Sequence, residues 1–336
     1  MKRSQKLKVG IIGLGMVGEP IRRWFEDLNG RKRGKDLFCY DSDPKKIFKD
    51  DVNKADVVFV SVPTPSNPDG SCNTSIVESV VAQIKDGKII IIKSTVEPGT
   101  VQRLQDKYPK KRFIFNPEFL TESQSWEDFI SPDRQIVSTT AKSESDAIEI
   151  LNLLPRKNFI RPWTSDYSQK SVNTTEAEMG KYASNVFGFL KVAYGNILAD
   201  LAHAMTLKYS AENKKTKKTK VNYENIKDLI SADLRIGPAW LNVNHGNYCG
   251  AGGYCFPKDM AAFISFANSL AEQLNKKKTD PAFMKVLKKG IGVLKAAESY
   301  NVELLRAQGL SVEDVSKHNQ EIIIQKRKEI RKISNS

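Results

Sequence analysis

The sequence has no long hydrophobic run and no low-complexity tract beyond one lysine-rich stretch. Its apolar stretches fall short of the ~18 residues that a membrane-spanning helix needs, so no membrane association is expected. The start of the chain is basic and then apolar, but the apolar part is short and soon rich in glycine. We therefore expect it to form an opening strand and not a secretion signal, which favours a cytoplasmic protein.

Cysteine is scarce, and the four cysteines show no spacing typical of a metal site. Cys249 and Cys255 lie six residues apart and do not form a C-x-x-C motif. Reduced thiols and no bound metal are expected. An isolated cysteine is usually a small buried apolar residue, which suits Cys39, Cys72 and Cys249.

Acidic residues are outnumbered: 53 Lys and Arg face 39 Asp and Glu, a formal net charge of +14 at pH 7. Such a charge suits a nucleic-acid binder, or a lysine-rich solvated surface that also helps with phosphate-bearing ligands. The basic residues are spread out except in 214–220 and 325–332, without interleaved aromatic residues or a nucleic-acid motif. We favour the solvated surface and expect no nucleic-acid partner.

The first half of the chain alternates apolar runs with segments of helical length. The expected strands are 7–15, 37–41, 55–63, 88–95, 112–118 and 134–139. Apolar residues at helical spacing predict a helix over 16–28, ended by Asn29-Gly30. Unbroken apolar strands between helices are typical of a parallel sheet covered on both faces, so residues 1–165 are predicted to form an α/β, Rossmann-like, doubly wound domain.

The second half is predicted to be mostly α-helical. A long helix is expected over 174–209, inside a connecting segment 166–209, because this stretch lacks proline. The remaining residues, 210–336, are predicted to form a helical domain. Its expected helices are 222–235, 258–274, 281–307 and 311–332.

A glycine motif, Gly13-x-Gly15-x-x-Gly18, follows the first expected strand and opens the first helix. In this context the first glycine makes the turn, the second lets backbone approach a pyrophosphate, and the third lets the helix pack on the strand. The helix N-terminus then stabilises the phosphate charge. Asp41 ends the second strand and can bind ribose hydroxyls, which favours NAD, although nearby Lys45 and Lys46 leave room for NADP.

Candidate catalytic groups lie in the second half. Lys181 and Asn185 are four residues apart on the expected long helix, so both can donate to one substrate oxygen. Such a pair is also common on a solvated helix face. Cys255 follows a glycine-rich stretch that lets substrate come close, and Lys258 and Asp259 supply charge beside it. A thiolate can capture an aldehyde left by one hydride removal; a second removal leaves a thioester, which water opens to an acid.

A series of motifs follows in order along the chain: VGIIGLGMVG, YDSDP, VPTPSNPDGS, KSTVEPGT, NPEFLTES, PDRQIVS, EAEMGKYASN, RIG at 235–237 and GAGGYCFPKD. In this order they resemble the nucleotide-sugar dehydrogenase family, which includes UDP-glucose and GDP-mannose dehydrogenases. The resemblance implies NAD as cofactor and oxidation of a nucleotide sugar, in the first instance UDP-glucose to UDP-glucuronate. It also implies a homodimer formed through the long helix.

The resemblance further implies roles for individual residues. Cys255 would be the nucleophile, Lys181 and Asn185 would hold the substrate oxygen, and Glu118 would activate water together with Thr95. Asp259 would pair with Lys181 or with that water. The implied cofactor contacts are Gly13, Gly15, Met16, Val17, Gly18, Asp41, Pro63, Thr64, Thr95 and Glu122. The implied substrate contacts are Glu118, Phe119, Leu120, Lys181, Asn185, Arg235, Gly252 and Gly253.

The sequence departs from the family pattern in several places. In the glycine-rich loop before Cys255, Cys249 and Ala251 replace aromatic residues of the family pattern, which predicts a wider or looser loop. The segment between Asp41 and the third strand is short, which predicts the loss of a helix. The chain ends about where the family's third domain begins, and that domain is expected to be absent.

Two other functions stay open. A one-step dehydrogenase of the β-hydroxyacid type would share the glycine motif and the Lys-x-x-x-Asn pair, but it has no need of Cys255. A non-catalytic NAD-binding relic would need none of the six polar groups assigned to catalysis.

Overall fold

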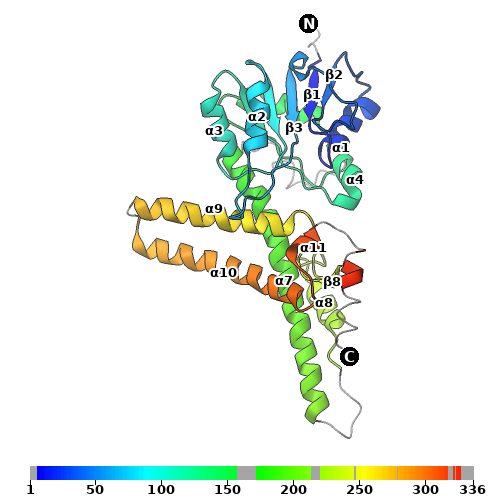
Figure 1. Cartoon of the computed structure of the whole chain (residues 1–336), viewed down its shortest axis with the longest axis vertical. Coiled ribbons are helices and arrows are strands. Elements are labelled where there is room, and N and C mark those ends of the chain that lie inside the picture. Colours follow the sequence, from blue (N-terminus) through cyan, green and yellow to red (C-terminus); the bar gives the residue numbers. More distant parts are fainter. Residues whose placement is uncertain are drawn as a thin grey trace. The chain divides into compact units, whose positions relative to one another are not determined.

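The computed structural model describes residues 6–156, 172–212, 220–245, 247–277, 279–316, 321 and 323–326. The chain divides into two compact units (Figure 1). The first comprises Met1–Asn67 and Cys72–Lys181, and the second comprises Pro68–Ser71 and Tyr182–Ser336. The domain boundary expected at residue 165 lies outside the described residues.

The first unit is built on a six-stranded sheet with the order β2-β1-β3-β4-β5-β6. Its first five strands are parallel, as the unbroken apolar runs predicted. They are β1 (Val9–Ile12), β2 (Leu37–Tyr40), β3 (Val57–Val60), β4 (Ile89–Ile92) and β5 (Arg112–Phe115). The predicted α/β, doubly wound fold class is confirmed.

The sixth strand differs from its prediction. β6 is only Ser138–Thr139, and it runs antiparallel to β5. The preceding residues of the predicted strand bond to a side chain instead, because Asn116 Nδ2 donates to Gln135 Oε1 at 2.9 Å and to the Ile136 carbonyl at 2.5 Å. The expectation of a full strand over 134–139 within a wholly parallel sheet was therefore wrong.

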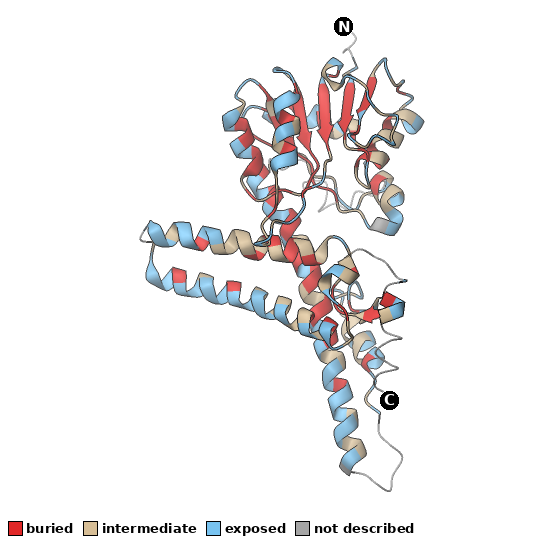
Figure 2. Cartoon of the chain, in the orientation of Figure 1, coloured by how far each residue is buried: buried red, intermediate tan, exposed pale blue. Residues whose placement is uncertain are grey.

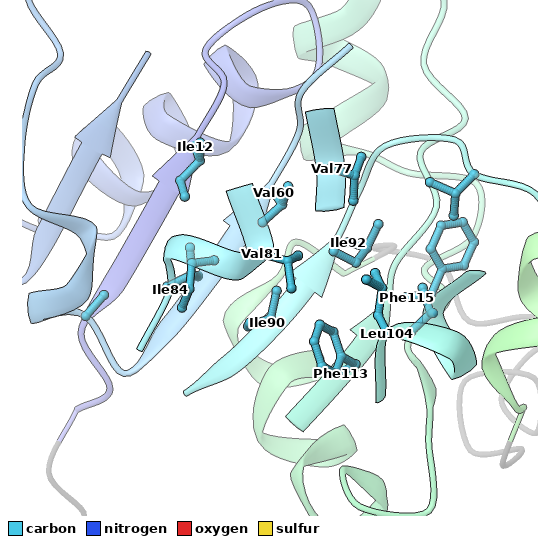
Figure 3. Packing of buried hydrophobic residues seen from close by; sticks show 14 of the residues in the cluster. Ile12, Val60, Val77, Val81, Ile84, Ile90, Ile92, Leu104, Phe113 and Phe115 are labelled. Atoms are coloured by element: carbon cyan, nitrogen blue, oxygen red, sulfur yellow. The ribbon is translucent and has the colours of Figure 1, made fainter. Parts of the chain in front are cut away.

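Successive side chains along a strand point to opposite faces of the sheet, so strands that are apolar throughout make both faces apolar. Helices cover both faces. On one face, strand residues pack against α2 (Ser75–Gln83) and α3 (Thr100–Lys107) (Figure 3). On the other face they pack against α1 (Gly18–Arg23), η1 (Trp24–Leu28), α4 (Ser125–Ile130) and α5 (Ala147–Leu153). Two buried layers result, and the loops at the strand ends carry the polar residues.

Short turns complete the first unit. The helix predicted over 16–28 is present as α1 followed by the π-helical turn η1. Between β2 and β3, where every residue is described, the one helical element is the 3-10 turn η2 (Val52–Lys54), which agrees with the predicted loss of a helix. Two more 3-10 turns are η3 (Glu122–Gln124) and η4 (Glu144–Asp146).

The helices of the second unit follow α7 (Thr174–Glu212), which begins in the first unit and confirms the long helix. The others are α8 (Tyr223–Ser231), α9 (Phe256–Lys276), α10 (Pro281–Arg306) and α11 (Val312–Ser316). α8 ends four residues before the predicted 235. Of the helix predicted over 311–332, α11 is present, whereas 317–320, 322 and 327–336 lie outside the described residues.

A two-stranded hairpin of β7 (Asn244–His245) and β8 (Tyr248–Cys249) was not predicted, because two-residue strands leave no periodic pattern. α9 and α10 lie side by side as a helical hairpin (Figure 1). Their outward positions are exposed, whereas the strands of the sheet are buried (Figure 2). In the described part of the chain, no helix is both long and apolar enough to cross a membrane.

Apolar side chains of α7 and α9 form the core of the second unit. Phe189 and Val192 of α7 belong to one buried cluster with Met260 and Ile264 of α9. A Cβ on Gly188 of α7 would lie 2.5 Å from the ring of Phe256. This glycine inside a long helix therefore lets the first residue of α9 pack against α7.

Glu178 of α7 caps the N-terminus of α3 inside the first unit. Its carboxylate accepts hydrogen bonds from Gly99 N at 2.5 Å and from Val101 N at 2.8 Å. The side chain is fully buried, and burial raises the pKa of Glu178 to about 7 although these hydrogen bonds oppose the shift. Between the unfolded pKa near 4.5 and this value, the folded chain holds a proton that the unfolded chain has released. The free energy of unfolding therefore falls as the pH rises through this range.

Replacing Glu178 by glutamine is expected to flatten this pH dependence. At low pH the acid and the amide are both neutral, whereas above pH 7 only the wild type must bury a carboxylate. Chemical denaturation from pH 4.5 to 8 should show the variant gaining roughly 1–3 kcal/mol relative to the wild type. Glu176→Gln, on the exposed side of the same turn, is the control. Parallel curves for wild type and Glu178→Gln would contradict the assignment.

Candidate active site

The residues predicted to bind a cofactor follow the carboxyl ends of β1 to β4. Strand order reverses between β1 and β3, and in open α/β sheets ligands bind outside the strand ends at such a point. The loops are joined there, because Thr64 Oγ1 after β3 donates to the Thr95 carbonyl after β4 at 2.8 Å. Pro63 is exposed and Thr95 is half-buried. The side chain of Glu122 lies outside the described part of the structure.

The glycine loop after β1 fits a dinucleotide. Gly13 has φ +85°, and a Cβ there would lie 2.6 Å from the Ser61 carbonyl oxygen. A Cβ on Gly18 would overlap the Gly13 carbonyl, whereas Gly15 faces open space. The outer glycines thus serve the turn and the packing, and the middle one leaves room for a pyrophosphate. Met16 and Val17, both half-buried, lead from this loop into α1.

Asp41 ties the end of β2 to the glycine loop. Its Oδ2 accepts hydrogen bonds from Leu14 N at 2.7 Å and from Lys46 Nζ at 3.0 Å, and its Oδ1 accepts one from Asp43 N at 2.9 Å. Burial alone would raise the pKa of Asp41, but these hydrogen bonds outweigh it and lower the pKa. The carboxylate is therefore ionised and fixed beside the loop, as an acceptor for ribose hydroxyls must be. Lys46, which left room for NADP, pairs with it.

A buried charge cluster lies after β4 and β5 in the first unit. Lys181 Nζ is 3.1 Å from Glu118 Oε1, and both side chains are less than a tenth exposed. Glu118 Oε2 accepts from Leu120 N at 2.7 Å. Burial opposes ionisation of Glu118, but Lys181, the Leu120 amide and the more distant Lys93 lower its pKa. Glu118 is therefore a carboxylate at neutral pH. Phe119, the residue between, has the Lys181 ammonium 5.1 Å from its ring centre.

Lys93 is the cluster residue that sequence reasoning missed. It follows β4, is buried, and donates to Asn116 Oδ1 at 2.8 Å. Burial lowers the pKa of Lys93 to about 8. The available signal was a lysine placed directly after four isoleucines, where an apolar strand enters the polar edge of the sheet. Lys93 is the first residue of the family motif KSTVEPGT, but no role was predicted for it.

A second polar cluster lies in the second unit. Asn185 Nδ2 donates to Asp259 Oδ2 at 2.5 Å, and Lys258 Nζ donates to Asp259 Oδ1 at 2.7 Å. Asp259 is buried in the first turn of α9. Lys181 and Asn185, one turn apart on α7, thus have different acceptors at rest. The structure pairs Lys181 with Glu118, in place of the suggested Lys181–Asp259 pair.

Cys255 is the N-cap residue of α9, and its carbonyl accepts from Asp259 N at 2.8 Å. The residue thus lies at the N-terminus of α9, the end of a helix that carries partial positive charge. All four cysteines lie in the described part of the chain, and none is in a disulfide. Cys39 and Cys72 are buried as expected, whereas Cys249 is half-buried.

The glycine loop before Cys255 is tightly packed, so the expectation of a looser loop was wrong. Ala251 is 1% exposed. Gly252 lies so close to the ring and hydroxyl of Tyr248 that a Cβ there would overlap them. Gly253 has φ +76°, which favours glycine. Tyr248 therefore packs directly against the loop at Gly252.

Arg235 has no described interaction with either cluster. It follows α8 and is exposed. Its Nη2 lies 2.6 Å from Asp233 Oδ2. Lys191 of α7 holds the adjoining backbone by donating to the carbonyls of Ile236 at 2.6 Å and Gly237 at 3.1 Å. The predicted residues are thus divided: one group is in the first unit, one is in the second, and Arg235 contacts neither through a described interaction.

Two family models match the chain. The NAD-binding domain of the UDP-glucose/GDP-mannose dehydrogenase family matches residues 46–153, and the central domain of the same family matches residues 213–280. Together they span more than half of the chain. The chain belongs to the UDP-glucose/GDP-mannose dehydrogenase family. The resemblance in the motifs is confirmed, and so is NAD as the cofactor, since the first unit contains this family's NAD-binding domain.

Curated members of the family are similar over much of the chain. The UDP-glucose 6-dehydrogenase of Pseudomonas aeruginosa is 32% identical over 304 residues, 78% of this chain. That of Rickettsia bellii is 31% identical over 228 residues, 65% of this chain. The chain spans 61% of the length of the first relative and 46% of the second.

Solved structures of the family share the fold. A UDP-glucose dehydrogenase from Pyrobaculum islandicum has a TM-score of 0.66 at 25% identity, covering 91% of this chain and 72% of that one. The UDP-D-ManNAc dehydrogenase of Pyrococcus horikoshii has a TM-score of 0.63 at 19% identity, covering 90% and 70%. The second likeness concerns the fold alone.

Proposed function

We propose that this protein oxidises the C6 alcohol of a nucleotide sugar to a carboxylate, with UDP-glucose as the first candidate and UDP-glucuronate as the product. The reaction consumes one alcohol, one water and two NAD+, and yields the acid, two NADH and two protons. The observation that carries the proposal is the Asn185–Asp259 hydrogen bond of 2.5 Å. It ties the amide predicted to hold the reacting oxygen to the first turn of the helix that Cys255 caps.

Lys181 and Asn185 would hold the substrate oxygen. An ammonium group has three donors and a side-chain amide has two, so each residue keeps a donor beyond its bond to Glu118 or Asp259. Both donors stabilise an oxygen that gains negative charge as the alcohol loses its proton, or as a tetrahedral adduct forms.

Cys255 would form the covalent intermediate. When bound at the glycine loop after β1, NAD supplies the hydride acceptor. The thiolate bonds to the aldehyde carbon to give a thiohemiacetal, and loss of a second hydride leaves a thioester. Thr95 and the carboxylate of Glu118 would orient water and take its proton, releasing the acid and the thiol. The lowered pKa of Glu118 makes it a weak base at rest, and contact of Lys181 with the substrate would weaken the pair that lowers this pKa.

The choice of UDP-glucose draws its support from the relatives that carry this name at about one-third identity. Reaction in the cytoplasm suits a mechanism that needs a reduced thiol. A homodimer is part of the proposal. Exposed apolar residues recur every seven positions on α7, which gives one stripe on the helix. They are Phe187, Tyr194 and Leu201. Light scattering of the purified chain should give twice the mass of one chain, and a monomer would contradict this part.

The function is tested by counting NADH. The full chain is incubated with NAD+ and a limiting amount of UDP-glucose, and separately with GDP-mannose and UDP-N-acetylmannosamine. Two NADH per sugar consumed, with the uronic acid as product, is the expected result. One NADH per substrate would favour the one-step dehydrogenase instead. NAD binding without turnover of any sugar nucleotide would favour a non-catalytic role.

A further inference from the structure

Two side-chain amides form hydrogen bonds with the backbone of the loop that leads to Cys255. One belongs to a residue of α10 and the other to a residue just beyond the end of α10. Asn301 Oδ1 accepts from Ala251 N at 2.7 Å, and Asn301 Nδ2 donates to the Ala251 carbonyl at 3.0 Å. Gln308 Oε1 accepts from Cys249 N at 2.8 Å, and Gln308 Nε2 donates to the Cys249 carbonyl at 2.9 Å. Each amide therefore bonds both backbone groups of one loop residue.

This arrangement restrains the loop more than single contacts would. A side-chain amide carries the same donor and acceptor as a peptide group, so it pairs with backbone as a neighbouring strand does. Asn301 is 2% exposed, and a buried backbone group left without its partner is costly, so the paired geometry is strongly favoured. The two held residues are next-but-one neighbours, which fixes both the position and the direction of the chain between them.

The residue between the two held positions has to be glycine. Gly250 has φ +110°, and a Cβ on it would lie 2.8 Å from Asn301 Oδ1. Farther along, Gly253 N donates to the Val315 carbonyl of α11 at 3.1 Å. On the far side of the thiol, the Cys255 carbonyl accepts from Asp259 N. The backbone is thus tethered on both sides of Cys255. The tethers that precede it come from Asn301 of α10, from Gln308 just beyond α10, and from Val315 of α11.

We infer that Asn301 and Gln308 are positioning residues, which hold the Cys255 loop in place through paired hydrogen bonds to Ala251 and Cys249. The inference rests on the proposed role of Cys255 as nucleophile. A thiolate attacks only from a narrow range of distances and angles, and a displacement of about 1 Å can cost roughly a hundredfold in rate. Neither amide touches the reacting atoms, so their effect acts through the loop alone.

Asn301→Leu and Gln308→Met test the inference, because both remove the paired hydrogen bonds without adding charge. Asn196→Leu is the matched control. Asn196 is also 2% exposed and also lies on a helix, but its amide donates only to the Val192 carbonyl within α7. Gln308 is only half-buried, so its variant remains informative if Asn301→Leu does not fold. Circular dichroism and thermal melting establish which variants are folded.

Two readouts are compared in the folded variants. The first is the pH profile of Cys255 alkylation by iodoacetamide, located at Cys255 by tandem mass spectrometry. The second is kcat and KM for the nucleotide sugar and for NAD. Relative to Asn196→Leu, we expect kcat to fall roughly ten- to a hundredfold with KM for NAD within about twofold, and the alkylation profile to shift.

The inference is overturned if Gln308→Met and any folded Asn301→Leu match Asn196→Leu in both readouts. Alkylation requires neither NAD nor a sugar. A wild type that turns over no nucleotide sugar would count against the proposed function, whereas the alkylation profiles would still decide whether these amides position Cys255.

Discussion

Replacing Cys255 by serine is expected to lower kcat for NADH formation from UDP-glucose by about a thousandfold or more. A serine hydroxyl is protonated at neutral pH and is a far weaker nucleophile than a thiolate at the N-terminus of α9. The aldehyde left by the first hydride removal then has no covalent route to the acid. Stopped-flow absorbance at 340 nm under single-turnover conditions measures both oxidations, and Cys255→Ser should yield at most one NADH per site.

Cys249→Ser is the matched control for this prediction. Cys249 lies in the same loop, is half-buried like Cys255, and is held through its backbone by Gln308. Its serine variant should keep kcat within about threefold of the wild type, because its sulfur has no role in the proposed chemistry. Equal losses in the two variants would mean that the loop tolerates no substitution, and full activity of Cys255→Ser would remove the thioester mechanism.

Replacing Lys181 by methionine is expected to lower the free energy of unfolding by about 3–5 kcal/mol. The change removes one partner of a buried ion pair and leaves Glu118, whose side chain is 7% exposed, without it. Methionine matches lysine in length, so lost packing contributes little. Urea denaturation followed by circular dichroism measures the change. Activity should fall as well, since the same ammonium would hold the substrate oxygen.

The double variant Lys181→Met/Glu118→Gln separates charge burial from packing. With both charges gone, most of the lost stability should return, because the cost arises from an unpaired buried carboxylate. Arg306→Met is the comparison for an exposed pair: Arg306 and Glu303 are more than 60% exposed, and its loss should cost less than about 1 kcal/mol. A small effect of Lys181→Met alone would show that Lys93 compensates for Glu118 without Lys181.

Much of the fold was predictable because it depends on local patterns. The five parallel strands are continuous apolar runs, and α7 is a long stretch without proline. The failures occurred where side chains from distant segments decide the backbone. The side-chain amide of Asn116 donates a hydrogen bond to the carbonyl of Ile136. That carbonyl therefore does not pair with a neighbouring strand, and β6 is short as a result. The β7–β8 hairpin is too short to leave a period in the sequence.

The candidate site shows the same division. Motif order singled out Glu118, Lys181, Asn185, Cys255 and Asp259, but not their partners at rest. The pairing of Lys181 with Glu118, and of Asn185 with Asp259, depends on which loops meet α7. Lys93 was passed over because a single lysine after a strand carries no signal until its burial is known.

By itself, the sequence determined the family, the NAD-binding α/β unit and the position of the thiol in the chain, because glycine spacing and apolar periodicity are local properties. Only the tertiary structure decided that Glu118 is an ionised partner of Lys181, and that one amide of α10 and another just beyond it hold the loop before Cys255. Those features arise from contacts between residues 50 or more positions apart along the chain. Burial and hydrogen bonding at that separation follow from packing and leave no pattern in the order of the residues.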